Sequence, residues 1–134
     1  MTQISNEELI EKAKSVVRPR KIKHGFEIGN VGCALLTNKG NIYLGVSIDT
    51  ISGMGFCAEH SAIAAMVTQG EQVIKKIVAV VEDGRPIPPC GRCREFMHQI
   101  HEQNINAEVI VEKNKSVKLK DLLPLPWDAN RSTT

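Results

Sequence analysis

The chain has 134 residues, of which 42% are hydrophobic and 24% charged, and we expect residues 1–134 to form a single globular domain around one hydrophobic core. Its net charge is only +2, and its aromatic residues are one Trp, one Tyr and three Phe. So small a charge and so few aromatic rings argue against a nucleic-acid surface, and no nucleic-acid partner is expected.

The chain carries no sign of a membrane segment or an export signal. Residues 1–8 lack the basic start and the apolar run of a signal peptide, and no stretch approaches the roughly 18 apolar residues of a spanning helix. Four cysteines without a disulfide framework suit a reducing compartment, so a cytoplasmic protein is expected. One basic segment, residues 18–24, could contact phosphates, but a solvated loop is the favoured interpretation.

The first half of the chain predicts a helix followed by a hairpin. Ser5 and Glu8 have the spacing of a capping box, and apolar residues then recur at helical intervals until the chain reaches Pro19. The elements expected next are a loop over 18–30, a buried strand over 31–37, a hairpin turn over 38–41, a partner strand over 42–48 and a glycine-bearing loop over 49–56.

The second half predicts two helices that alternate with strands. We expect, in order, a helix over 57–68 that stops at Gly70, a buried strand over 76–81, a proline-rich connection over 84–89, a helix over 90–104, a strand over 107–111 and a short edge strand over 117–119. Two strand–helix–strand crossovers imply parallel pairing of the central strands. The sequence therefore predicts a three-layer α/β/α domain with a mixed sheet of about five strands.

Two short motifs concentrate the reactive side chains. Cys57-Ala58-Glu59 opens one expected helix, and Pro89-Cys90-Gly91-Arg92-Cys93 opens the next. Both helices begin at the carboxyl ends of strands, where ligands of open α/β sheets gather, so residue 57 should lie near residues 90 and 93.

Three thiols and one carboxylate in this arrangement predict a catalytic zinc site. Catalytic zinc keeps three protein ligands and one open position, which a water molecule occupies. We expect one Zn²⁺ per chain on Cys57, Cys90 and Cys93, with Glu59 moving the protons of the water. A structural zinc site and a redox pair are the alternatives. The fourth cysteine, Cys33, lies in an apolar run and is expected to act as a small buried hydrophobe.

These motifs resemble the cytidine deaminase family, in particular its small homotetrameric branch. The resemblance runs from about residue 31 to residue 127 and includes the strands over 31–37 and 42–48 and the closing turn Asp121-Leu122-Leu123-Pro124. It implies a zinc-dependent hydrolase that converts free cytidine or deoxycytidine to uridine or deoxyuridine and ammonia. It also implies a homotetramer whose active sites are shared between subunits.

The resemblance assigns substrate contacts to five positions. The Ala58 N–H would hold O2 of the base, and the Pro88 carbonyl would accept a hydrogen bond from the amino group. Ser47 and Asp49 stand where the family has an Asn and a Glu that hold the ribose hydroxyls. Trp127 matches a C-terminal aromatic residue that reaches a neighbouring subunit's site.

The chain departs from the family beside the zinc ligands. The family has an Arg after each cysteine motif; Arg94 keeps the second, but His60 replaces the first. A protonated His60, a neutral donor to a cysteine sulfur and a helix-surface histidine are all open interpretations.

The chain also departs from the family around the sugar. Gly29 or a neighbour replaces a Phe before the first core strand. The missing Arg and the altered sugar motif resemble the blasticidin S deaminases, so a modified cytosine nucleoside such as blasticidin S is an alternative substrate. A non-enzymatic zinc or redox module is the second alternative function.

Overall fold

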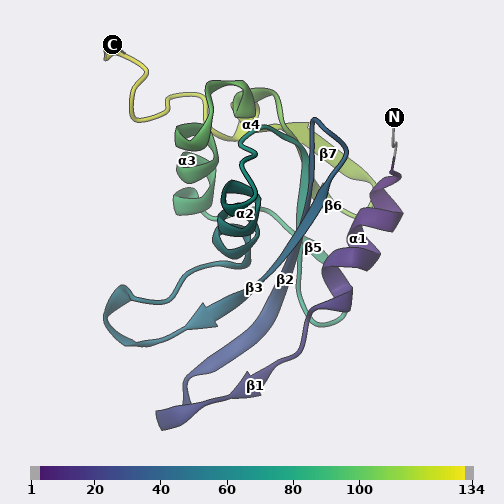
Figure 1. Ribbon diagram of the computed structural model, residues 1–134, viewed down its shortest axis with the longest axis vertical. Coiled ribbons are helices and arrows are strands. Elements are labelled where there is room, and N and C mark those ends of the chain that lie inside the picture. Colours follow the sequence, from purple (N-terminus) through teal and green to yellow (C-terminus); the bar gives the residue numbers. More distant parts are fainter. Residues whose placement is uncertain (1–3, 132–134) are drawn as a thin grey trace.

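The computed structural model describes residues 4–131 as one mixed sheet with helices on both faces (Figure 1). Its helices are α1 (Asn6–Ser15), α2 (Ala58–Thr68), α3 (Gly91–Ile100) and α4 (Leu119–Leu122), with short 3-10 turns η1 (Lys23–Gly25), η2 (Ile51–Gly53) and η3 (Glu102–Asn106). Its strands are β1 (Arg20–Lys21), β2 (Glu27–Thr37), β3 (Ile42–Asp49), β4 (Ile74–Val80), β5 (Pro86–Ile87), β6 (Glu108–Glu112) and β7 (Lys115–Lys118).

The predicted three-layer α/β/α architecture is confirmed, but the sheet has seven strands rather than about five. The two additional strands, β1 and β5, are two residues long and lie in segments expected to be connections. Strand β1 pairs with the start of β2, and β5 pairs with the end of β4. Both extra pairings are too short to leave a periodic signal in the sequence.

The expectation of parallel central strands is correct for only one pair. Strands β4 and β6 pair in parallel, as the crossover through α3 requires. Strand β2, however, lies between β3 and β4 and pairs antiparallel with both. The crossover through α2 therefore passes over β2, and the strands that it joins are not neighbours.

The sheet is buried on both faces because β2 and β4 carry apolar residues on both sides. Cys33 and Leu35 point to a core shared with α2 and α3, whereas Ala34 points to a second core shared with α1. Gly45 on β3 lets α2 approach closely, since a Cβ there would lie 2.4 Å from the Ala62 nitrogen. The result is a rigid platform for the first turns of α2 and α3.

Several predicted boundaries were wrong. Strand β2 begins at Glu27, four residues before the apolar run that predicted it. The helix expected over 90–104 is α3 followed by η3, because His101 has an extended backbone between them. The edge strand expected over 117–119 is β7, and the chain turns into α4 at Leu119.

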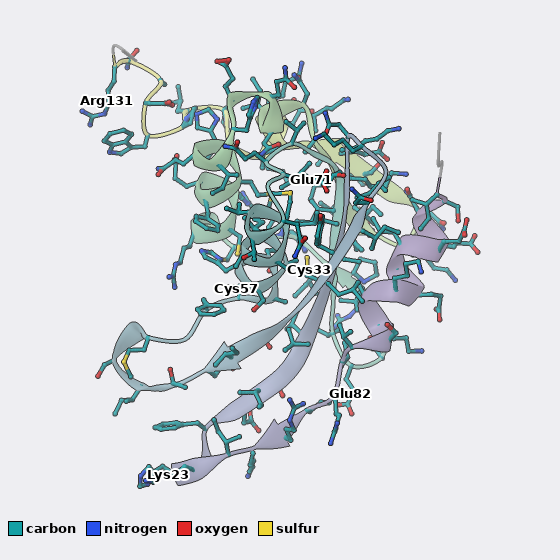
Figure 2. All side chains as sticks on the ribbon, in the orientation of Figure 1. Lys23, Cys33, Cys57, Glu71, Glu82 and Arg131 are labelled. Carbon is teal, nitrogen blue, oxygen red and sulfur yellow. The ribbon has the colours of Figure 1, made fainter. Side chains whose placement is uncertain are left out.

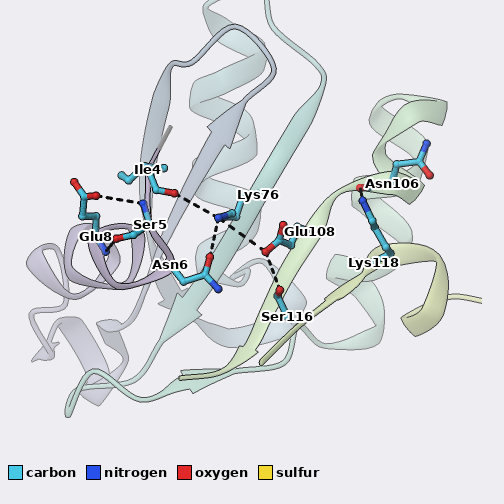
Figure 3. Close-up of polar contacts among 9 residues, drawn as sticks. All are labelled: Ile4, Ser5, Asn6, Glu8, Lys76, Asn106, Glu108, Ser116 and Lys118. Carbon is cyan, nitrogen blue, oxygen red and sulfur yellow. Dashed lines mark hydrogen bonds and ion pairs between the residues drawn. The ribbon is translucent and has the colours of Figure 1, made fainter. Parts of the chain in front are cut away.

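One lysine joins α1 to the middle of the sheet (Figure 3). Lys76 Nζ on β4 donates to Asn6 Oδ1 at 2.7 Å and to the Ile4 carbonyl at 3.4 Å. It also lies 3.9 Å from Glu108 Oε2 on β6, and that carboxylate accepts from Ser116 Oγ on β7 at 2.7 Å. The network connects the start of α1 to the three strands β4, β6 and β7.

The buried side chain of Asn104 joins three segments on the other face. Its Oδ1 accepts from Ile74 N–H at 2.8 Å, and its Nδ2 donates to the carbonyls of Gln72 at 3.0 Å and Met97 at 2.9 Å. We expect Asn104→Ala to lower the free energy of unfolding by about 2–4 kcal/mol, because three backbone groups lose their partner and two of these hydrogen bonds are buried. Urea denaturation measures this, with the exposed Asn114→Ala as control; equal stability of the two variants would contradict the assignment.

None of the described helices is long and apolar enough to span a membrane.

Candidate active site

The three cysteines of the two motifs converge at the starts of α2 and α3. Cys57 is the N-cap residue of α2, and Cys90 is the N-cap residue of α3. Cys57 Sγ lies 3.5 Å from Cys90 Sγ, and Cys90 Sγ lies 3.6 Å from Cys93 Sγ. Two helix N-termini therefore direct backbone N–H groups and partial positive charge toward the sulfurs.

This sulfur cluster fits a zinc ion. All three Sγ atoms lie within 4.8 Å of one another. A tetrahedral centre with a Zn–S length of about 2.3 Å places its sulfurs roughly 3.8 Å apart, close to the observed separations. Burial and the Glu59 carboxylate raise the pKa of the Cys93 thiol far above its usual range, so a cation is needed to hold Cys93 as a thiolate.

The remaining cysteine takes no part in the cluster. Cys33 is fully buried on β2 and is not one of the three cysteines whose sulfurs cluster; Figure 2 labels both Cys33 and Cys57. Burial raises the pKa of its thiol, so Cys33 stays protonated within the apolar core. Its expected role as a small hydrophobe is confirmed.

A cavity of about 330 Å³ opens beside the cluster. It is bounded by the bulged stretch of β2, the end of β3, the η2 loop and the first turns of α2 and α3. The loop closes through an isolated bridge between Ile48 and Phe56, and Gly55 is needed there because a Cβ would lie 2.2 Å from the Ile48 oxygen. The residues that line the cavity include Asn30, Ser47, Asp49, Thr50, Cys57, Ala58, Glu59 and Arg92.

Glu59 lies on the first turn of α2 and reaches the cavity wall while only 5% exposed. Burial raises the pKa of its carboxyl group. A carboxyl group with a raised pKa exchanges a proton near neutral pH more readily than an exposed one, which suits a general acid–base. The structure thus places Glu59 and Cys57 on the wall of one cavity.

His60 is a buried residue rather than a helix-surface histidine. Its ring stacks on Phe96 with centroids 4.2 Å apart and planes 3° from parallel. Its Nδ1 lies 3.4 Å from Cys93 Sγ. Burial, followed by the charge of Arg92, lowers the pKa of His60, which favours a neutral imidazole that donates from Nδ1 to the sulfur.

Arg94 forms hydrogen bonds to the backbone around the second cysteine motif. Its Nε donates to the Pro89 carbonyl at 2.9 Å, and its Nη1 donates to the Leu122 carbonyl at 3.1 Å. It thereby ties the loop before Cys90 to α4.

The two residues expected to contact the sugar, Ser47 and Asp49, differ in the hydrogen-bonding groups that they have available for a ligand. Ser47 is buried, and its Oγ accepts from Val31 N–H at 3.0 Å, which satisfies the backbone of the β2 bulge. Asp49 is exposed and lines the cavity. Ser47 therefore has its hydroxyl hydrogen and one lone pair left for a ligand, whereas Asp49 has its whole carboxylate.

The two residues expected to contact the base, Ala58 and Pro88, differ in their position relative to the cavity. Ala58 is buried, lines the cavity and is the first residue of α2, whose N–H has no acceptor within the helix. Pro88 is exposed and follows Ile87, which does line the cavity, but Pro88 itself borders a different hollow beside α1.

Trp127 is not among the residues that line this cavity. Its ring is 62% exposed and carries the Arg131 guanidinium 4.3 Å from its centroid. Trp127 N–H donates to Glu95 Oε1 at 2.8 Å, and Asp128 bonds to His98 at 2.8 Å, so the tail is held on α3. Arg131, which marks this tail, lies well apart from Cys57 (Figure 2).

Three residues of this region had no role in the sequence-based prediction. Phe96 supplies the stacking partner of His60, Asn30 lines the cavity, and Arg92 adds a cation to its wall. Arg92 lies inside the second cysteine motif, and that position was the available signal. Nothing in the spacing of Asn30 or Phe96 indicated that they would meet the site.

We expect His60→Phe to fold, because its ring can still stack on Phe96, but to bind zinc about 10-fold or more weakly, because Cys93 loses its donor. Competition with a chromophoric chelator measures the affinity. His24→Gln, on the exposed η1 turn, controls for the loss of an imidazole. Parent-like zinc affinity in His60→Phe would contradict this role.

Comparison with known proteins agrees with the geometry. Residues 4–111 match the family model described as the cytidine and deoxycytidylate deaminase zinc-binding region. A cytidine deaminase from Halalkalibacterium halodurans is 37% identical over 71 residues, covering 52% of this chain and 54% of that protein. A blasticidin-S deaminase from Bacillus cereus is 34% identical over 113 residues, covering 75% and 79% of the two chains.

A solved structure shares the fold over nearly the full chain. The cytidine deaminase from Burkholderia pseudomallei superposes with a TM-score of 0.75 at 29% identity, covering 92% of this chain and all of that one. Against the first curated relatives, in contrast, the chain spans about half of their length, with 54%, 46% and 50% covered.

Proposed function

Because the chain belongs to the cytidine and deoxycytidylate deaminase family, we propose that it is a zinc-dependent hydrolase that deaminates the cytosine ring of a free nucleoside, with cytidine and deoxycytidine as reference substrates. The observation that supports this most is the single cavity onto which Cys57, Glu59 and Asp49 all open. Its volume of about 330 Å³ suits a small molecule.

We assign Cys57, Cys90 and Cys93 as the ligands of one zinc ion, which the cluster suits. Bound there, zinc supplies a Lewis acid that lowers the pKa of a water molecule to about 7. Among residues 4–131 the cluster of potential ligands has three members, whereas a structural zinc site is closed by four. This favours the enzyme over a non-enzymatic zinc or redox module.

The chain's own groups would then carry the reaction. Glu59 accepts a proton from the attacking water, whose oxygen forms a bond to C4 of the ring, and delivers a proton to N3. Glu59 then takes the remaining proton from the new hydroxyl group on C4 and passes it to the amino group, so that C4 becomes a carbonyl, the C4–N4 bond breaks and ammonia leaves. The Ala58 N–H holds O2 of the base, and the Pro88 carbonyl accepts from the amino group. Cytidine and water thereby give uridine and ammonia.

A modified cytosine nucleoside, such as blasticidin S, is the second candidate substrate. His60 in place of the family's Arg and Ser47 committed to the β2 backbone both depart from the cytidine-binding pattern. The 34% identity to a blasticidin-S deaminase over most of the chain favours the same candidate.

All four cysteines are free thiols, which suits the proposed cytoplasmic location.

A panel of aminated compounds tests the activity. Zinc-loaded protein is incubated with cytidine, deoxycytidine, blasticidin S, free cytosine and adenosine, and released ammonia is measured. Release from one or more cytosine nucleosides, with none from adenosine, is expected. Absence of ammonia from all the nucleosides would reject the proposed function.

We propose in addition that the protein is a homotetramer in which Trp127 closes over the base in a neighbouring subunit. The resemblance to the small tetrameric branch motivates the proposal, and the 62% exposure of the ring supports it. Aromatic rings bury a large area and stack well on bases. We expect Trp127→Ala to keep zinc but to raise KM by about 10-fold, since stacking on a base contributes about 1–3 kcal/mol.

Subunit mixing separates a shared site from a site within one chain. Glu59→Gln chains and Trp127→Ala chains, each with low activity, are exchanged into mixed oligomers. A rise in activity after demonstrated exchange is expected, because some sites then combine an intact Glu59 with an intact Trp127. No rise, or a monomer by light scattering, would overturn the shared site.

A further inference from the structure

We propose that His98 and Asp128 are positioning residues for Trp127, because they clasp the C-terminal tail onto α3 and hold the indole outward, ready to meet a neighbouring subunit. This inference rests on the proposed function, and in particular on the site shared between subunits. It names the groups that set the position of the aromatic residue. The clasp consists of the side-chain contacts that Glu95, His98 and Asp128 make between α3 and residues 127–128.

The clasp joins two adjacent tail residues to one face of α3. Trp127 N–H donates to Glu95 Oε1 at 2.8 Å, and His98 Nε2 lies 2.8 Å from Asp128 Oδ1. Glu95 and His98 are three positions apart on the helix, so their side chains lie on the same face, one turn apart. Two anchors at this spacing fix both the position and the direction of the backbone at Trp127, whereas a single anchor would let the tail rotate.

The His98 side of the clasp is built into the body of the protein. The His98 side chain is only 11% exposed, and its Nδ1 is buried with no hydrogen-bond partner among the described residues. Nε2 is therefore the ring nitrogen that is committed, and because a carboxylate can only accept, Nε2 carries the hydrogen that joins it to Asp128. A hydrogen bond to a largely buried donor is stronger than the same bond in water, since the local dielectric constant is lower.

The tail is also stiff between its base and the clasp. Arg94 on α3 donates to the Leu122 carbonyl at 3.1 Å, so the same helix holds the tail where it begins. Residues 123–126 read Leu-Pro-Leu-Pro, and each proline fixes its own φ at about −65° and restricts the residue before it. A short segment that is held at both ends and contains two prolines has few conformations. Little entropy is then lost when Trp127 binds.

The indole is presented with a cation on one face and is otherwise open. The Arg131 guanidinium lies 4.3 Å from the ring centroid, and its Nε donates to the Trp127 carbonyl at 3.0 Å. The ring is nonetheless largely exposed, as is Leu125 two residues earlier. Figure 2 shows Arg131 at the outer end of the tail, beyond α3. Stacking on a base needs one face of an indole, so the face opposite Arg131 is free to meet a neighbouring subunit's cavity.

The chain contains a single Trp, so its fluorescence reports on the clasp without reference to activity. Anisotropy and acrylamide quenching are measured on zinc-loaded protein. We expect Asp128→Ala to lower the anisotropy and to raise the quenching constant, because the tail loses its bond to His98. Asp128→Asn keeps an oxygen that can accept from Nε2–H and should stay close to the parent. Asn130→Ala, an exposed change in the same tail, is the control and should also match the parent.

Binding measurements then show whether the clasp acts through Trp127. Dissociation constants of cytidine and blasticidin S are measured by calorimetry on zinc-loaded protein in the Glu59→Gln background. We expect Asp128→Ala to weaken binding of at least one of them by about 3- to 10-fold with unchanged zinc content, and Asp128→Asn to restore most of the affinity. In chains that already carry Trp127→Ala, Asp128→Ala should have no further effect, because a positioning residue acts only through the residue that it positions.

Several results would overturn the inference. They are parental fluorescence or parental affinity in Asp128→Ala, equal losses in Asp128→Ala and Asp128→Asn, a loss that adds to that of Trp127→Ala, and no binding of either probe by the parent. A monomer by light scattering would overturn it too, because no neighbour would receive the ring. Protein that shows the expected fluorescence and binding differences but releases no ammonia with Glu59 intact would instead reject the proposed function alone.

Discussion

Replacing Cys90 with Ser is expected to abolish stoichiometric zinc binding and to lower the melting temperature by about 10 °C or more. Cys90 Sγ is the central atom of the cluster, within 3.6 Å of both other sulfurs. Serine offers no thiolate, so the ion would lose one of its three protein ligands. Because metal binding to a folded site contributes to folding free energy, stability should fall together with metal content.

Elemental analysis and thermal unfolding of protein purified without chelator measure the two effects. Cys33→Ala is the matched control, since it removes a buried thiol that lies outside the cluster. We expect this control to keep one zinc per chain and to lose only about 1 kcal/mol of stability. A Cys90→Ser protein with parental zinc content and melting temperature would show that the cluster does not bind the ion.

Replacing Glu59 with Gln is expected to lower kcat by about 10²–10⁴-fold while zinc stays bound. The amide keeps the shape of the carboxyl group in its 5% exposed position but cannot carry a proton. Because Glu59 is assigned more than one proton transfer, the loss should be near the upper end of that range.

Steady-state kinetics with cytidine, alongside zinc analysis, measure this prediction. Glu71→Gln serves as the control, because Glu71 is also a buried glutamate but bonds to Tyr43 and Asn41 on the hairpin, outside the cavity. We expect Glu71→Gln to lower the free energy of unfolding and to leave kcat within a factor of about two of the parent value. Turnover of Glu59→Gln within a few-fold of the parent would assign the proton transfers to another group.

Local signals in the sequence were sufficient for most of the fold. The Ser5–Glu8 capping box forms as expected, with both reciprocal hydrogen bonds present. The continuous apolar run that ends at Thr37 predicted a strand buried on both faces, and the structure has β2 there. The order of strands was less accessible, because the position of β2 between β3 and β4 depends on long-range pairing that no local pattern records.

The cysteine motifs predicted the sulfur cluster because helix starts at one edge of a sheet bring distant residues together. The surroundings of the cluster were not predictable in the same way. His60 lies on Phe96 because two helices pack side by side, and a sequence spacing of 36 residues carries no trace of that contact. The hydrogen bonds of Arg94 to the Pro89 and Leu122 carbonyls were not predictable either, because they depend on where α4 folds back.

The most direct test of the proposed activity is deamination of cytidine by zinc-loaded protein in water enriched in oxygen-18. We expect ammonia and uridine in equal amounts, with one labelled oxygen at C4 of the uridine, and about 10²–10⁴-fold less of both from Glu59→Gln. Hydrolysis at C4 requires this label, because the new oxygen comes from water. Unlabelled uridine, or no uridine from protein with a full complement of zinc, would contradict the account.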